Sequence, residues 1–358
     1  MKRQLTVIFL SLVLLATLIS AVFARPKGMN RYSDTFFGVF DTVVEIIGYA
    51  DSEQTFQREI QKAKDVLTRF HRLFDAYNEY ENLNNLYVIN RDAGRAPVKT
   101  DEEMIRFLDW AVSLQSLFPP CGVNIAMGSV LSLWHDAREA YLAGLPASVP
   151  DGEALLLAGE HTDIDSLVID REAGTVFFLD PEMILDFGAL AKGYAVERAA
   201  ELLESGEMPC FLINAGGNVR AGRAPGDGRD KWSVGVRNPD SPDEILNTLH
   251  VNGLSVVTSG DYERRFEADG AYYGHIISPE TLFPATRYRS VTVVTPDSGF
   301  ADYLSTRLFL MPYGEGRALV ESLRASDAWD SAEVYWIFPD GRTEMTDGMR
   351  ELMNSQDK

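Results

Sequence analysis

The chain has 358 residues, of which 46% are hydrophobic and 24% are charged, a balance that is typical of a folded globular protein with a large core. Its formal net charge of −20 argues against a nucleic-acid partner, because binding nucleic-acid phosphates requires clustered Lys and Arg. An anionic ligand would need local help from a helix N-terminus, isolated basic side chains or a bound cation.

The N-terminal segment, residues 1–27, has the pattern of an export signal. Lys2 and Arg3 precede a long apolar run, and Val22-Phe23-Ala24 is a candidate cleavage site. The run is also long enough to remain as a membrane anchor, since roughly 20 apolar residues span a bilayer. Cleavage and retention both stay open. Either way, we expect residues 28–350 to form a catalytic domain outside the cytoplasm.

The rest of the chain predicts one domain that mixes helices and strands. Residues 36–50 are rich in β-branched and aromatic side chains and predict a strand, whereas residues 55–77 and 101–118 have helical periodicity. From residue 166 onward, short strands separated by Asp, Gly and Pro alternate with fewer helices. No linker or internal repeat divides the chain. The predicted fold class is α/β, as a single mixed α+β domain.

A turn with Asp and Gly lies before a helix in the stretch LDFGALAKGYAVERAAELL. We expect a strand to end at Leu185, Asp186–Gly188 to form the turn, and an amphipathic helix to follow. Such a helix start offers free N–H groups to an anion. A plain capped strand-to-helix junction is the alternative. The stretch is not a phosphate-binding P-loop, because Tyr194 stands where that motif requires Lys.

Three further features are candidates for chemistry, each with a structural alternative. Gly216 and Gly217 follow a predicted strand and either allow close backbone approach or form a bulge. His275 precedes two isoleucines and, taken alone, is a structural histidine. Asp302 and Thr306 are four residues apart, so on a helix both oxygens share one face and suit Mg²⁺. Otherwise, Asp302 is a residue at the helix N-terminus and Thr306 a packing residue.

Taken together and in order, eight motifs resemble the FAD:protein FMN transferase family, also called ApbE. They are FDTVVEI, FDAYNEYENLNNLYVIN, NIAMGSVLSLW, LDFGALAKGYAVERAAELL, INAGGNVRAG, TSGDYERRFE, HIISPET and ADYLSTRLF. The resemblance runs from about Thr35 to Leu310. It implies an exported enzyme that splits FAD at its pyrophosphate, uses Mg²⁺ and attaches FMN to a Thr or Ser of a partner protein.

The resemblance also implies roles for residues at matching positions. The metal ligands would be Asp302, Thr306 and the backbone carbonyl of Ala189. The flavin would contact Tyr77, Asp186 and the segment Gly122, Val123 and Asn124, and Lys192 would lie near the ring wall or the phosphates. His275 and Ile276 would close over the adenosine-phosphate end, with His275 as a proton-transfer residue and Asp302 as the second catalytic residue.

The chain departs from the family pattern at three of these places. Asn124 replaces an Asp, while Ser278 and Leu282 replace a commoner Asp and Gly in the loop after His275. Asn124 can still donate and accept hydrogen bonds to a flavin, and the two changes in the loop leave its shape open. None of these changes affects Asp302 or Thr306.

The expected function is Mg²⁺-dependent transfer of FMN from FAD to a Thr or Ser hydroxyl, with release of AMP. The partners would be FAD and an acceptor protein, expected to be a membrane or exported redox protein, and no nucleic acid. Two alternatives remain: an FAD pyrophosphatase that yields FMN and AMP, and a non-catalytic exported flavin-binding protein.

Overall fold

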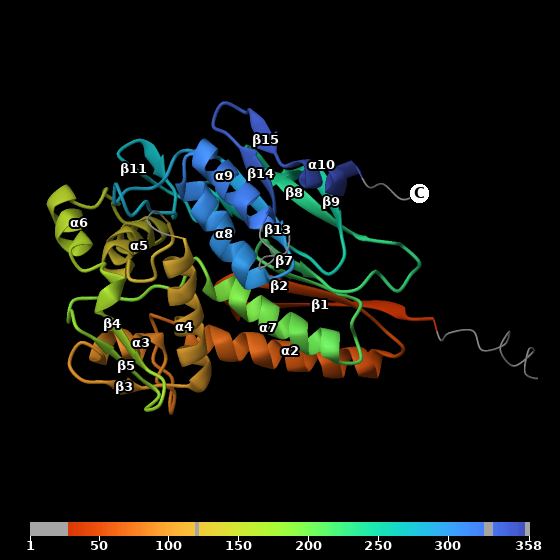
Figure 1. The fold of residues 1–358 in the computed structure, drawn as a ribbon, viewed down its shortest axis with the longest axis horizontal. Coiled ribbons are helices and arrows are strands. Elements are labelled where there is room, and N and C mark those ends of the chain that lie inside the picture. The colour runs from red at the N-terminus through yellow and green to blue at the C-terminus, as the bar shows by residue number, and fades with distance from the viewer. Residues whose placement is uncertain (1–27, 119–121, 326–331, 355–358) are drawn as a thin grey trace, which may run out of the picture.

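The computed structural model describes residues 28–118, 122–325 and 332–354 and is built around one antiparallel sheet (Figure 1). Eight strands follow the order β1-β2-β6-β7-β10-β13-β14-β15, and each neighbouring pair is antiparallel. The strands are β1 (Asn30–Val39), β2 (Thr42–Ala50), β6 (Phe211–Ala215), β7 (Asn218–Ala221), β10 (Ser255–Gly260), β13 (Ser290–Thr295), β14 (Glu333–Ile337) and β15 (Thr343–Met345). The predicted mixture of helices and strands is confirmed.

The other elements surround this sheet. The helices are α2 (Glu53–Leu73), α3 (Leu86–Asp92), α4 (Glu102–Leu117), α5 (Gly128–Leu142), α6 (Gly152–Gly159), α7 (Ala191–Ser205), α8 (Ser298–Leu310), α9 (Tyr313–Arg324) and α10 (Asp347–Asn354), with a 3-10 turn at Ile164–Ser166. The remaining strands are β3 (Val98–Lys99), β4 (Leu167–Asp170), β5 (Thr175–Phe178), β8 (Trp232–Asn238), β9 (Ser241–Val251), β11 (Phe266–Ala268) and β12 (Ala271–Tyr273).

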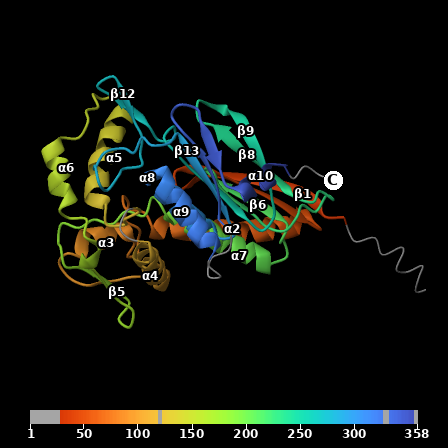
Figure 2. The ribbon, with the colours of Figure 1, turned by 45° about the horizontal axis from the view of Figure 1, so that its top comes forward.

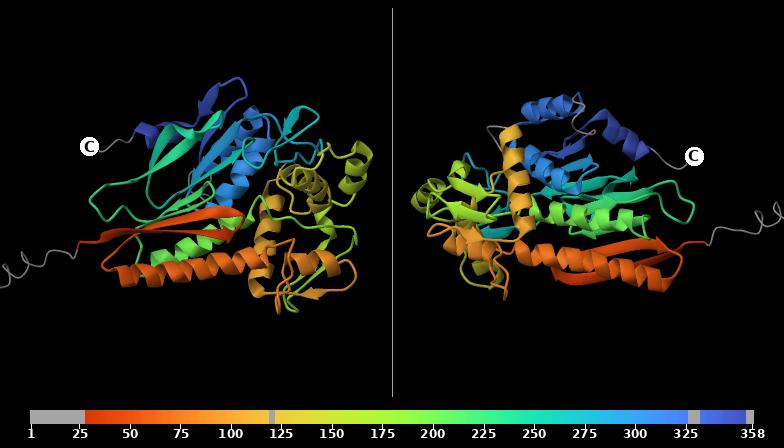
Figure 3. Two further views of the ribbon diagram at one scale, coloured as in Figure 1. Left: turned by 180° about the vertical axis from the view of Figure 1, so that it is seen from behind. Right: turned by 60° about the horizontal axis from the view of Figure 1, so that its bottom comes forward.

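The sheet is covered differently on its two faces. Helices α2, α7 and α8 pack side by side against one face (Figures 1 and 3), and the β8–β9 hairpin and α10 cover the other. Helices α5 and α6 lie with β12 at one end of the molecule (Figure 2), where a separate small core holds Met127, Trp134 and Phe266. The functional pocket forms where this small core meets the main core.

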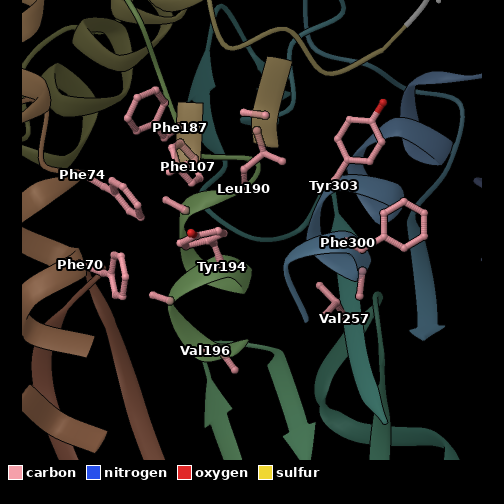
Figure 4. Close-up of a cluster of buried hydrophobic side chains, with 14 of the residues drawn as sticks. Phe70, Phe74, Phe107, Phe187, Leu190, Tyr194, Val196, Val257, Phe300 and Tyr303 are labelled. Carbon is pink, nitrogen blue, oxygen red and sulfur yellow. The ribbon is translucent and has the colours of Figure 1, made fainter. Parts of the chain in front are cut away.

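Phe187 fixes the turn before α7 in the main core. Its side chain is 2% exposed and packs edge-on against Phe74 and against the ring of Phe107 (Figure 4). Tyr194, the fourth residue of α7, contacts the same two rings. Because Phe187 is buried, Asp186 before it and Gly188 after it are held at the edge of the core.

The single strand predicted for residues 36–50 is wrong, because these residues form part of a hairpin. Phe40 and Asp41 both have positive φ, as the central residues of a two-residue hairpin require, and Val39 pairs with Thr42 across the turn. Such turns usually contain Asn or Gly, which this sequence lacks at both positions. The β-branched and aromatic residues on both sides of the turn therefore concealed the reversal.

The strand predicted to end at Leu185 is also wrong, since the segment before α7 is extended but joins no sheet. The side-chain amide of Asn90 takes the place of a strand partner: its Oδ1 accepts from Leu185 N at 2.8 Å, and its Nδ2 donates to Leu185 O at 2.9 Å. Asp186 N then donates to the carbonyl of Ile125. The predicted turn and the predicted helix after it are both present.

The described residues contain no helix that is both long and apolar enough to cross a membrane. The export or anchor segment predicted for residues 1–27 lies outside the described residues.

Candidate active site

One pocket of about 630 Å³ collects every residue that the sequence singled out as a site residue. Its walls include Tyr77, Gly122, Val123, Asn124, Asp186, Ala189, Lys192, His275, Ile276, Asp302 and Thr306. These residues come from segments that are far apart in the sequence, so the shared pocket is a result of the fold. Their chemical roles remain predictions.

The predicted metal ligands lie where the first turn of α7 meets α8. Gly193 N donates to Asp302 Oδ2 at 2.8 Å. That N–H is one of the donors left free at the start of α7, which begins at Ala191, two residues after Ala189. A Cβ on Gly193 would lie 2.4 Å from the carbonyl oxygen of Ser298 and 2.5 Å from Asp302 Cβ, so only glycine fits this contact.

A chain of hydroxyl groups sets the position of Thr306. Its Oγ1 lies 3.2 Å from Ser259 Oγ, which lies 2.9 Å from Ser305 Oγ. Ser305 Oγ in turn donates to the backbone carbonyl of Asp302 at 3.0 Å. Asp302, Thr306 and Ala189 line the same pocket and carry a carboxylate, a hydroxyl and a peptide carbonyl, respectively. This set of hard oxygen donors fits Mg²⁺, which usually keeps few protein ligands and several waters or phosphate oxygens.

A buried ion pair supports the start of α8 behind this donor set. Glu197 Oε2 accepts from Ser298 N at 2.7 Å and from Arg220 Nε at 3.2 Å. The Glu197 and Arg220 side chains are each less than 10% exposed. Ser298 Oγ also donates to Asn218 Oδ1 at 3.2 Å. These contacts join α7, β7 and α8. Together with the hydrogen bond from Gly193 N, they hold Asp302 of α8 close to α7.

The surroundings raise the pKa of two acidic side chains in the pocket. Burial raises the pKa of Asp302, against the opposing effects of Lys192 and the Gly193 hydrogen bond. Burial likewise raises the pKa of Asp186, whose Oδ1 accepts from Gly188 N at 2.8 Å. A nearby cation would favour the charged form of either acid, as Lys192 does for Asp302.

Tyr77 lies on a tight turn after α2 that is organised by Asp75. Asp75 Oδ1 accepts from Tyr77 N at 2.7 Å, and its Oδ2 accepts from Tyr80 Oη at 2.7 Å and from Asn78 Nδ2 at 3.0 Å. Burial acts to raise the pKa of Asp75, but these hydrogen bonds outweigh it and hold that pKa below its ordinary value. Tyr77 itself is 56% exposed and offers a flat aromatic surface to the pocket.

Asn124 is already engaged within the protein. Its Nδ2 donates to the carbonyl of Thr162 at 2.8 Å, and its Oδ1 accepts from Ala126 N at 2.9 Å. The amide keeps one N–H and one lone pair for a ligand. Its first role here is to hold the loop before α5.

His275 has one ring nitrogen fixed by the backbone. Its Nδ1 lies 3.0 Å from the carbonyl oxygen of Glu263, which can only accept, so Nδ1 carries the hydrogen and Nε2 carries the lone pair. Desolvation by the pocket walls lowers the pKa of His275 to about 4 and the charge of Arg264 contributes next, although the residue itself stays exposed to solvent. The imidazole is therefore neutral at pH 7, with Nε2 available to accept a proton.

The loop after His275 tolerates its unusual Leu282. This residue has a φ of 60°, a left-handed conformation that favours glycine. Leu282 N donates to the carbonyl of Ser278, and the carbonyl of Leu282 accepts from Trp134 Nε1 at 2.8 Å. These bonds close the loop onto α5 and compensate for the strained backbone.

Several pocket residues were not predicted from the sequence. Besides the predicted Lys192, the lining includes three further basic side chains among the described residues, Arg138, Arg237 and Arg264, in a chain whose net charge is −20. His135 also lines the pocket, one turn before Arg138 on α5. The spacing of Leu131, His135 and Arg138 places them on one helix face, which was the signal available in the sequence.

Comparison with known proteins agrees with this geometry. The model of the ApbE family matches residues 40–329. The chain is 34% identical to the FAD:protein FMN transferase of Treponema pallidum over 74% of this chain and 73% of that one. It is 31% identical to the FAD:protein FMN transferase of Klebsiella pneumoniae over 72% of this chain and 80% of that one.

Solved structures share the fold. The crystal structure of the ApbE protein from Thermotoga maritima superimposes with a TM-score of 0.77 at 26% identity, covering 91% of this chain and all of that one. The flavin transferase ApbE from Vibrio cholerae, at 22% identity and a TM-score of 0.73 over 90% of this chain and 99% of that one, shows the same fold. The chain therefore belongs to the ApbE family.

Proposed function

We propose that this protein is an FAD:protein FMN transferase that uses Mg²⁺ to move FMN from FAD to a Thr or Ser hydroxyl of an acceptor protein, releasing AMP. The observation that carries the proposal is the single pocket in which an aromatic wall at Tyr77, oxygen donors at Asp302 and Thr306, and a neutral His275 come together. The names of the relatives at 31% and 34% identity support the same activity.

The reaction would break the pyrophosphate bond of FAD and form a phosphoester. The acceptor oxygen attacks the phosphorus of the FMN half, and the bond from that phosphorus to the bridging oxygen breaks, so that AMP leaves. His275 Nε2 accepts the hydroxyl proton, and its Nδ1–H stays on the Glu263 carbonyl. Lys192 and Arg264 offset the negative charge of the phosphates.

Mg²⁺, when bound, would neutralise the charge that develops on the phosphate oxygens. The side chains of Asp302 and Thr306 and the carbonyl of Ala189 would hold it. Tyr77 would cover the flat ring of the flavin, and Asp186 would accept hydrogen bonds from its edge.

Release of AMP from FAD distinguishes this proposal from its alternatives. Purified protein is incubated with FAD and Mg²⁺, with and without an acceptor protein that carries a candidate Thr or Ser. We expect AMP and covalent flavin only when the acceptor is present. AMP without acceptor would indicate an FAD pyrophosphatase, and FAD binding with no AMP in either case would indicate a flavin-binding protein.

Replacing Tyr77 with alanine should weaken FAD binding by roughly tenfold, because an aromatic stack contributes about 0.5–1.5 kcal/mol beyond the buried area. NAD shares the adenosine diphosphate but lacks the three-ring flavin, so it should compete poorly. A fluorescence titration of FAD, with NAD as competitor, measures both effects. Tyr272→Ala, at an exposed tyrosine outside the pocket lining, is the control. Unchanged FAD affinity in Tyr77→Ala would remove the flavin assignment of this wall.

As the pH is lowered, the kcat/KM of FMN transfer should begin to fall only well below pH 6.5, near pH 4. The pKa of His275 is lowered to about 4, so the free enzyme keeps the neutral base until the pH falls through that value. A pH profile of the wild type, compared with His275→Gln, tests this assignment. A wild-type limb near pH 6.5, or the same limb in His275→Gln, would exclude His275 as the base.

We also propose that residues 1–27 direct export. Strand β1 runs for ten residues from Asn30 toward the turn that lines the pocket, about 30 Å at 3.4 Å per residue. A retained anchor would thus join the domain far from the pocket mouth. Fusing residues 1–40 to a reporter that is active only after export should give an active reporter. A reporter that stays inactive in the cytoplasm would contradict the proposal.

A further inference from the structure

Tyr77 is stacked against a histidine from another part of the chain. The rings of Tyr77 and His135 lie with centroids 4.5 Å apart and planes inclined by 22°. Tyr77 Oη is 3.4 Å from His135 Nδ1. Both side chains line the pocket. One side of the Tyr77 ring is therefore covered by an imidazole, and more than half of the residue remains exposed.

Arg138 selects the form of the histidine that makes this stack. Its Nη2 lies 3.2 Å from His135 Nδ1, and a guanidinium can only donate, so Nδ1 must accept and the hydrogen must be on Nε2. Arg138 also forms an ion pair with Glu139 at 3.2 Å. Because His135 and Arg138 are one turn apart on α5, the helix itself fixes the position of the imidazole.

The turn at Asp75 fixes the backbone of Tyr77 but not its ring. The hydrogen bonds of the Asp75 carboxylate come from the backbone of Tyr77 and from Asn78 and Tyr80, and none comes from the Tyr77 phenol. An exposed ring that must become ordered when a ligand stacks on it loses rotamer freedom, which lowers affinity. The contact with His135 can remove this cost in advance.

We propose that His135 is a positioning residue for substrate binding, which holds the Tyr77 ring in the orientation that a flat three-ring ligand needs. The inference rests on the proposed function, since it takes the flavin of FAD as the ligand of Tyr77. His135 acts through Tyr77 and takes no part in the bond-making step. Its loss should therefore change the KM for FAD and leave kcat at saturating FAD nearly unchanged.

His135→Ala should raise the Kd of FAD by about three- to tenfold, the range expected for one lost aromatic pair. Alanine is a good helix former, so α5 should keep its structure. His135→Phe restores a ring without the hydrogen bond from Arg138 and should recover most of the affinity. The control is Asp136→Ala at the next, exposed position of α5, which should bind FAD as the wild type does. Fluorescence titration of FAD gives each Kd.

A double-mutant cycle then tests whether His135 acts through Tyr77. In the Tyr77→Ala background, adding His135→Ala should change the Kd of FAD by less than twofold, because the ring that it positions is absent. Additive losses, an unchanged Kd in His135→Ala, or a fall in kcat at saturating FAD would each overturn the inference. If Tyr77→Ala binds FAD normally, the flavin wall itself fails. If Tyr77→Ala weakens binding but His135→Ala does not, only the inference on His135 fails.

Discussion

Asp302→Asn should reduce the rate of FMN transfer by roughly a hundredfold or more, since several kcal/mol of transition-state stabilisation depend on a catalytic metal. Asparagine keeps the shape of the side chain and an oxygen that can accept from Gly193 N, but it removes the charge that holds a divalent cation. Without metal, the Asp302→Asn protein should be at least as stable to unfolding as the metal-free wild type. Burial raises the pKa of Asp302, which means that the folded chain disfavours its ionised form.

The measurement is the rate of covalent flavin formation at increasing Mg²⁺, together with a thermal melt in EDTA. Asp297 offers a matched control, because it caps the same helix by accepting from Phe300 N and does not line the pocket. Asp297→Asn keeps a good helix cap and should remain active. Full activity of Asp302→Asn at limiting Mg²⁺ would refute the metal assignment.

The sequence predicted residues that prove to line one pocket, and some of them carry local signals. Asp302 and Thr306 have helical spacing, and the structure places both on α8 facing one pocket. The turn at Asp186 precedes a periodic apolar pattern that forms α7. Where such signals lie within one helix or one turn, short-range geometry is enough to bring the side chains together.

The fold was less predictable where a side chain or an unusual turn replaced a standard one. The side-chain amide of Asn90 pairs with the backbone of Leu185 across 95 positions of sequence, and no local pattern indicates such a bond. Phe40 and Asp41 reverse the chain with positive φ although neither is Asn or Gly. In both cases tertiary contacts outweigh the local preference of the sequence.

The remaining pocket residues depend on packing between distant elements. His135 and Arg138 belong to α5, and they reach the pocket because the small core around Trp134 holds that helix against β11. Arg264 has a positive φ, and its guanidinium donates to the carbonyl of Phe40 at 3.1 Å, which joins two turns at the pocket. The positive charges of Arg138 and Arg264 explain how a chain with a net charge of −20 can accept an anionic substrate.

The close contact of α7 with α8 connects the fold to the proposed chemistry. Gly193 supplies the N–H that fixes Asp302, and a Cβ at this position would overlap Ser298 and Asp302 of α8. The ion pair of Glu197 and Arg220 holds the start of α8 at the same distance. Small shifts of α8 should therefore disturb Asp302 and Thr306 together.

Gly193→Ala should lower both stability and FMN transfer, and it is the substitution outside the metal ligands with the largest expected effect. The added Cβ would lie 2.4 Å from the carbonyl oxygen of Ser298, which is backbone and cannot rotate away. Overpacking of this kind typically costs about 1–3 kcal/mol. Moving α8 would also lengthen the bond from Gly193 N to Asp302, so Mg²⁺ affinity should fall along with the melting temperature. Thermal melts and Mg²⁺ titrations of activity measure the two effects.

Gly314→Ala provides the comparison, because a Cβ at this position of α9 would meet no heavy atom within 4 Å. Alanine in a helix is favoured over glycine by roughly 0.5–1 kcal/mol, so this variant should be as stable as the wild type or slightly more stable, with unchanged activity. A Gly193→Ala protein that melts like the wild type and needs no additional Mg²⁺ would show that α8 can move without cost. In that case the separation of the two helices would not set the geometry of Asp302.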